Sequence, residues 1–250
     1  MRKLAAAVAA LALFGLGLAP GGGAARAADK VDLLLVLAAD VSRSIDEGEF
    51  ELQRKGYAAA LTDPKVIAAI VGGPHHAIAT TFVEWSGAGD QAVVVDWTVI
   101  RDEEAANGMA ATILQAPRSF VGRTSISAAI DYSMERLKAA PVEAERRVID
   151  VSGDGTSNSG RGVTEARDDA LAQGVTINGL AIINTNANPG YAFHTNPPGG
   201  LPKYYQDNVI GGPGAFLLVV ENFETFADAI TRKLMSEIAA TSGRWQAAAR

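Results

Sequence analysis

The 250-residue chain contains no cysteine. Disulfide frameworks and every cysteine-based metal or catalytic site are therefore excluded. Basic residues are also scarce, with 22 Lys and Arg against 28 Asp and Glu and a formal net charge of −6. An acidic balance argues against nucleic acid or an anionic membrane as the main partner. Beyond the N-terminal region no apolar run is long enough to span a bilayer. Without disulfides, stability must come from packing, with any bound metal adding to it.

The N-terminal segment has the pattern of a secretory signal peptide. Arg2 and Lys3 precede an apolar run over residues 4–18, and Ala25-Arg26-Ala27 supplies small residues for cleavage. We therefore predict a signal peptide over 1–27 and an exported, soluble chain, periplasmic or secreted, with no membrane insertion after cleavage. Cleavage removes three basic residues and no acidic ones, and moves the net charge to about −9.

Apolar runs alternate with segments of helical periodicity along the rest of the chain. Residues 31–39 are almost continuously apolar, as in a strand buried on both faces of a parallel sheet. The turn at 86–90 joins two strand-like segments as a hairpin, so one strand must be antiparallel. The predicted strands are 31–39, 77–84, 91–100, 147–152, 176–183 and 215–220, and the predicted helices are 46–61, 64–72, 103–115, 125–139, 164–173 and 223–239. This order predicts an α/β fold with a doubly wound, mostly parallel six-stranded sheet, one antiparallel edge strand and helices on both faces.

Residues 28–250 are expected to form a single domain with one long loop at 184–213. That loop is rich in Asn, Gly and Pro and is too long for an ordinary connection between a strand and the next element. It leaves the carboxyl end of a strand, which is the edge where open α/β sheets bind ligands.

A candidate metal site begins directly after the first buried strand. Asp40, Ser42 and Ser44 occupy alternate positions, so an extended or turning backbone can point all three into one concavity. Carboxylate and hydroxyl oxygens are hard ligands, suited to Mg²⁺, Mn²⁺ or Ca²⁺. Thr124 lies in a turn before a helix, and Asp154 ends the strand that begins near residue 147. All these segments are expected at the same edge of the sheet.

These segments resemble the metal-ion-dependent adhesion site (MIDAS) of von Willebrand factor A (vWA) domains, and all five positions match. The resemblance implies that Ser42 and Ser44 bind the metal directly and that Thr124 binds it directly or through water. It implies that Asp40 and Asp154 hold coordinating waters. A narrower similarity, to an uncharacterised bacterial family of exported vWA-like proteins, rests on Leu52-Gln53-Arg54, Glu84-Trp85-Ser86, Ile149–Gly155 and Ile177–Leu180.

Only two of the five groups carry charge, so a bound dication keeps positive character and lacks a full shell. We therefore expect a divalent-cation-dependent protein- or peptide-binding module, the metal being completed by a partner's Asp or Glu carboxylate. Two alternatives stay open, namely a metal-assisted hydrolase and a scaffold whose metal only stabilises the fold. The sequence favours a non-enzyme. Asp154-Gly155 followed by Asn158 resembles a segment of haloacid-dehalogenase-type phosphatases, but Ser42 stands where that family needs its second Asp.

Three further expectations concern residues outside the five. Tyr204 and Tyr205 are predicted to contact the partner beside the metal, because Tyr is a frequent interface anchor. That they pin the long loop to the domain is an equally strong alternative. Asp150 lies inside a strand and is expected to be buried in an ion pair with Arg146 or Arg147. His75 and His76 are expected to be loop residues rather than a second metal site.

Overall fold

The computed structural model describes residues 30–183, 189–221 and 225–239. The predicted signal peptide therefore lies outside the described residues. Six strands form one sheet in the order β3-β2-β1-β4-β5-β6, and their bounds are β1 Lys30–Asp40, β2 Ile78–Trp85, β3 Gln91–Ile100, β4 Glu143–Gly153, β5 Thr176–Ile182 and β6 Leu217–Val220. Only the edge pair β2–β3 is antiparallel among the pairs in this sheet. The predicted fold class is confirmed.

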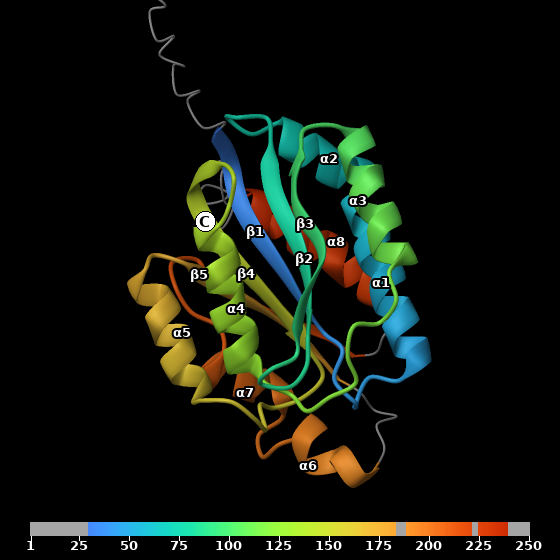
Figure 1. The fold of residues 1–250 in the computed structure, drawn as a ribbon, viewed down its shortest axis with the longest axis vertical. Helices are drawn as coiled ribbons and strands as arrows, with labels where there is room; N and C mark the ends of the chain where they lie inside the picture. Colours follow the sequence, from blue (N-terminus) through green and yellow to red (C-terminus); the bar gives the residue numbers. More distant parts are fainter. Residues whose placement is uncertain (1–29, 184–188, 222–224, 240–250) are drawn as a thin grey trace, which may run out of the picture.

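Helices cover both faces of the sheet. Their bounds are α1 Glu47–Leu61, α2 Pro64–Val71, α3 Glu103–Gln115, α4 Ile126–Lys138, α5 Val163–Ala172, α6 Ala192–Thr195, α7 Leu201–Asn208 and α8 Phe226–Ala239, with a 3₁₀ turn η1 at Pro189–Tyr191. Helices α4 and α5 lie in front of the sheet in Figure 1, and α8 lies behind it. No helix within the described ranges is long and apolar enough to cross a membrane.

The central strand β1 contributes to the core on both faces. Leu33, Leu35 and Leu37 pack with α1, α2, α3 and α8, whereas Leu34 and Val36 pack with α4, α5 and α7. Successive side chains of a strand point to opposite faces, so an uninterrupted apolar run is what a doubly covered strand requires. Strand β1 ends at Asp40, but the turn that follows stays buried, since Val41 and Ile45 still pack in the core.

The segment predicted as one long loop contains short helices. Beyond residues 184–188, which lie outside the described ranges, η1, α6 and α7 follow before β6. Helix α7 begins after Gly200, whose φ is +85°, and carries Pro at its start. Proline fits the first turn of a helix. The prediction of a loop was therefore wrong for this part, because its Gly and Pro mark helix ends rather than continuous irregular chain. Helices α6 and α7 lie at the end of the sheet where β1 and β4 finish (Figure 1).

Candidate metal site

The turn after β1 places its polar side chains in a compact group. The Ser42 backbone N–H donates to Asp40 Oδ1 at 2.7 Å, and the hydroxyl oxygens of Ser42 and Ser44 are 3.2 Å apart. A carboxylate that accepts from the N–H two residues ahead is a common way to close such a turn. Asp40 and Ser42 are buried, and Ser44 is half-buried. The alternating spacing thus brings the three side chains to one side, as expected.

Asp154 joins this group from the neighbouring strand. Strands β1 and β4 are parallel partners, so their carboxyl ends meet at one edge. The Ser44 hydroxyl donates to Asp154 Oδ1 at 2.6 Å, a short distance typical of a bond to a carboxylate. Residues far apart in the sequence are therefore in direct contact at the predicted position.

Thr124 reaches the same place from the turn before α4. Its backbone N–H donates to Asn158 Oδ1 at 3.0 Å. The next residue, Ser125, donates its N–H to the carbonyl of Ser86 in the β2–β3 turn at 2.7 Å. Thr124 and Ser44 both line a cavity of about 220 Å³. The structure thus brings the five predicted residues to one edge of the sheet.

The group carries unbalanced negative charge. Burial, and then the neighbouring Asp154, raises the pKa of Asp40 well above its usual value, and the hydrogen bonds from Ser42 oppose this only in part. The second oxygen of Asp40, Oδ2, is buried and has no hydrogen-bond partner among the described residues. Two buried carboxylates so close together are costly unless a cation compensates them. No cluster of three or more His, Cys, Asp or Glu side chains capable of holding a metal occurs in the described part of the chain, so any site here depends on the hydroxyls.

Arg118 fixes the backbone of the turn, and sequence reasoning missed it. Its Nη2 donates to the carbonyls of Val41, Ser42 and Ile45 at 2.9, 2.8 and 2.8 Å. The two N–H groups of this nitrogen are shared among three carbonyl acceptors, which leaves the turn little freedom to change shape. The signal available was a basic residue next to Pro117 in the segment before Thr124, which is too common to be diagnostic.

His194 of α6 is a second residue that sequence reasoning missed. Its Nε2 lies 3.0 Å from Thr124 Oγ1, and the side chain lines the same cavity as Ser44 and Thr124. Burial lowers the pKa of His194, which favours the neutral imidazole. The long segment after β5 therefore lies over the candidate site, as its exit from the carboxyl edge suggested.

The two tyrosines of α7 differ in exposure. Tyr205 is fully buried, and a Cβ on Gly153 would lie 2.7 Å from its hydroxyl and 2.9 Å from Asp40 Oδ2. Direct contact of Tyr205 with a partner was therefore a wrong expectation, because its ring packs in the core beneath the site. Tyr204 is half-buried, and its hydroxyl accepts from the Ser157 N–H at 3.2 Å. The arrangement fits the alternative in which these residues pin the segment to the domain.

Asp150 is buried and paired, but not with the arginines expected. Lys233 of α8 lies 2.6 Å from Asp150 Oδ1. Arg146 instead donates to the carbonyl of Glu237, and Arg147 donates to the carbonyl of Gln173. Lys233 lies far from Asp150 in the sequence, so a local sequence pattern could not indicate this pair. His75 and His76 are exposed, and lie in the turn before β2.

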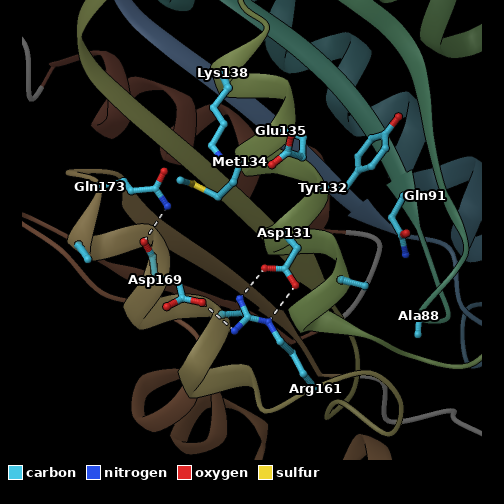
Figure 2. A pocket seen from close by; sticks show the side chains of 13 residues that line it. Ala88, Gln91, Asp131, Tyr132, Met134, Glu135, Lys138, Arg161, Asp169 and Gln173 are labelled. Atoms are coloured by element: carbon cyan, nitrogen blue, oxygen red, sulfur yellow. Dashed lines mark hydrogen bonds and ion pairs between the residues drawn. The ribbon is translucent and has the colours of Figure 1, made fainter.

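A larger hollow of about 730 Å³ lies on the face of α4 and α5, away from the five residues. Figure 2 shows Arg161 between Asp131 and Asp169, with ion-pair distances of 2.7 Å to each. These side chains are partly exposed and satisfy one another, as in an ordinary solvated groove.

Residues 30–242 match the family model described as "Protein of unknown function (DUF1194)". The chain belongs to this family. No curated protein matches the sequence of this DUF1194 chain.

Solved structures share its fold at low sequence identity. Proximal thread matrix protein 1 from the mussel byssus has a TM-score of 0.60 and 15% identity, over 85% of this chain and 48% of its own. The pilus adhesin SpaC from Lactobacillus rhamnosus GG has a TM-score of 0.62 and 12% identity, over 84% of this chain and 31% of its own. A von Willebrand factor type A protein from Catenulispora acidiphila has a TM-score of 0.58 and 13% identity, over 84% of this chain and 43% of its own. The DUF1194 chain thus has the vWA fold, and spans less than half the length of these three chains.

One of these neighbours has been solved with a bound metal. A further structure of the mussel protein, with a TM-score of 0.55 and 14% identity over 82% of this chain and 46% of its own, is described as having a zinc-occupied MIDAS motif. A vWA fold can therefore hold a divalent cation at a MIDAS.

Proposed function

We propose that the DUF1194 chain is a divalent-cation-dependent protein- or peptide-binding module of the adhesion type, acting outside the cytoplasm. The observation that carries the proposal is the convergence of Asp40, Ser42, Ser44, Thr124 and Asp154 on one edge of the sheet, with Asp40 Oδ2 buried and unpartnered among the described residues. The vWA fold supports a role in protein interaction. The group of hydroxyls and carboxylates at the sheet edge supports the proposal that this interaction depends on a bound metal.

The donor set fits a hard dication. Two ligands at right angles on an ion with bonds of about 2.1 Å lie about 3.0 Å apart, and the Ser42 and Ser44 hydroxyl oxygens are 3.2 Å apart. Ser42, Ser44 and Thr124 would hold Mg²⁺, Mn²⁺ or Ca²⁺ directly, and Asp40 and Asp154 would fix its waters. With hydroxyls as the direct ligands, the bound ion supplies an electrophile that accepts a carboxylate from outside.

The rim of the cavity supports an acidic partner. Arg43 and Arg123 line it beside Ser44 and Thr124, although the chain as a whole is acidic. The Arg123 guanidinium is held in place by a 2.7 Å bond to the carbonyl of Asn158. Local positive charge on an acidic protein steers anionic groups toward this edge. The partner we propose is a protein or peptide that offers an Asp or Glu carboxylate, and not a nucleic acid.

Metal binding is the first test. Calorimetry with the purified chain is expected to show binding of a single Mg²⁺ or Mn²⁺, at least about tenfold weaker in Asp40→Asn or Asp154→Asn. Asp168→Asn is the matched control, because Asp168 is exposed and pairs with the adjacent Arg167. A wild-type chain with a folded circular dichroism spectrum and no metal binding would contradict the proposal.

Capture from the source organism's envelope fraction separates the candidate roles. With Mg²⁺ present, wild-type chain is expected to retain a partner that EDTA and the Asp40→Asn variant both release. A scaffold metal would instead lower the melting temperature in EDTA without changing capture. Metal-dependent turnover of ester or phosphate model substrates would establish a hydrolase in place of the proposed binding module.

Tyr204→Phe tests whether this residue anchors a partner or the chain itself. Removing the hydroxyl that accepts from the Ser157 N–H is expected to lower stability by about 1 kcal/mol and leave partner capture unchanged. Thermal unfolding and capture measured on the same preparation provide both readouts. Lost capture at an unchanged melting temperature would restore the contact role for Tyr204.

A further inference from the structure

His194 faces the hydroxyl of a proposed metal ligand. Its Nε2 is 3.0 Å from Thr124 Oγ1, and both side chains line the cavity of about 220 Å³ together with Ser44. No other histidine of the chain is near, because His75 and His76 lie exposed before β2. The long segment after β5 thus brings an imidazole nitrogen next to proposed ligands that are all oxygens.

The imidazole is held by its other nitrogen. Nδ1 lies 3.2 Å from Thr156 Oγ1, and the Thr156 backbone N–H donates to the His194 carbonyl at 3.0 Å. In the tautomer that carries its proton on Nδ1 and donates it to Thr156, Nε2 is unprotonated and lies beside Thr124. Histidines that bind metals are usually oriented by such a bond from the second ring nitrogen.

Gly155 makes room for the ring. A Cβ at this position would lie 2.2 Å from His194 Nε2 and 2.6 Å from its Cε1, closer than any real carbon could approach. Gly155 does not have a positive φ, so backbone conformation does not demand glycine here. Glycine is required here because His194 approaches the end of β4 so closely.

The spacing also fits two neighbouring ligands of one ion. Ligands at right angles on an ion with bonds of about 2.1 Å lie about 3.0 Å apart, the separation of Nε2 and Thr124 Oγ1. We infer that His194 Nε2 is itself a ligand of the cation, next to Thr124. This inference rests on the proposed metal binding and adds a ligand from outside the five residues.

A nitrogen ligand changes which metals the site prefers. Imidazole binds Zn²⁺ and other transition metals well, whereas Mg²⁺ and Ca²⁺ favour oxygen. His194 therefore raises the affinity for Zn²⁺ and Mn²⁺ relative to Mg²⁺. It also takes a coordination position, so that fewer remain for water and for the partner's carboxylate.

Electron spin echo spectroscopy of bound Mn²⁺ detects such a ligand directly. The full chain loaded with Mn²⁺ is expected to show coupling to a ¹⁴N nucleus, and the coupling should vanish in His194→Gln. His75→Gln is the matched control and should retain it. Isothermal competition between Zn²⁺ and Mg²⁺ is expected to show at least about a tenfold smaller preference for Zn²⁺ in His194→Gln.

Gly155→Ala provides a second variant that keeps the histidine. Its methyl group must displace the ring, so loss of the ¹⁴N coupling is expected here too. Bound Mn²⁺ without nitrogen coupling in the wild type, or coupling that persists in His194→Gln, would overturn the inference and leave the proposed function standing. Absence of Mn²⁺ binding by the wild type would overturn the inference, and absence of Mg²⁺ and Ca²⁺ binding as well would also overturn the proposed function.

Discussion

Replacing Lys233 with methionine is expected to destabilise the folded chain by about 3–5 kcal/mol. Lys233 is fully buried, and its Nζ lies 2.6 Å from Asp150 Oδ1 and 2.9 Å from Glu237 Oε1. Both carboxylates are also fully buried. Methionine retains most of the volume but removes the charge, which leaves two carboxylates without a counterion between β4 and α8.

The destabilisation should depend on pH. Burial raises the pKa of Asp150 to about 7, against the opposing effect of Lys233 and with a further rise from Glu237. A carboxyl whose folded pKa is above its unfolded value of about 4 favours the fold at low pH, and this contribution is lost as pH rises through that interval. Without Lys233 the Asp150 carboxylate can be neutralised only by a proton. The deficit of Lys233→Met should therefore be smaller at pH 5 than at pH 8.

Two further variants isolate the cause. Asp150→Asn leaves Lys233 paired with Glu237, and should flatten the dependence of stability on pH between about 4 and 7. Lys203→Met is the control, because Lys203 pairs with Asp207 at the surface, where a loss is within about 0.5 kcal/mol. Urea unfolding across this pH range gives the readout. Equal effects of Lys233→Met and Lys203→Met would contradict a buried charge cluster.

The sheet and the convergence of the five residues at one edge could be predicted from local patterns, whereas their grouping as a metal site also drew on the resemblance to vWA domains. The apolar run before Asp40 identifies a doubly covered strand, and parallel strands bring their ends to one edge. The alternate positions of Asp40, Ser42 and Ser44 in the turn after this strand then suffice to predict that their side chains lie together. Boundaries were less accurate where charge obscures a strand. Strand β4 begins at Glu143 rather than near residue 147. The prediction missed its first residues because they include charged side chains at the partly exposed start of the strand.

The remaining features depend on which distant segments meet. Nothing near Asp150 in the sequence indicates Lys233, since the pair forms only when α8 packs behind the sheet. His194 and Arg118 approach the site on segments whose path is set by turns and short helices. Their residue types are unremarkable in loops. The sequence therefore placed the five candidate residues beside the strand and helix ends from which they extend, and it missed the groups that surround them.

Arg118→Lys is expected to lower both the stability of the fold and the affinity for metal. One Nη2 of Arg118 donates to the carbonyls of Val41, Ser42 and Ile45, and its Nε donates to Phe120 O at 3.1 Å. A lysine ammonium keeps the charge but has no planar fork with which to satisfy these acceptors together. Losing such bonds should cost about 2–3 kcal/mol.

The retained charge makes this variant informative about geometry. Arg118 is near enough to Asp40 to lower its pKa slightly, so a neutral substitution would also change the electrostatics at the cation. With lysine, a change in affinity reports the shape of the turn that carries Ser42 and Ser44. We expect a loss of about 10- to 100-fold in Mn²⁺ affinity, the usual effect of removing a group that orients metal ligands. Arg147→Met is the control, because that guanidinium donates to the Gln173 carbonyl away from the site. A lower melting temperature of Arg118→Lys with unchanged Mn²⁺ affinity would mean that the Asp40–Ser42 bond alone keeps the turn in shape.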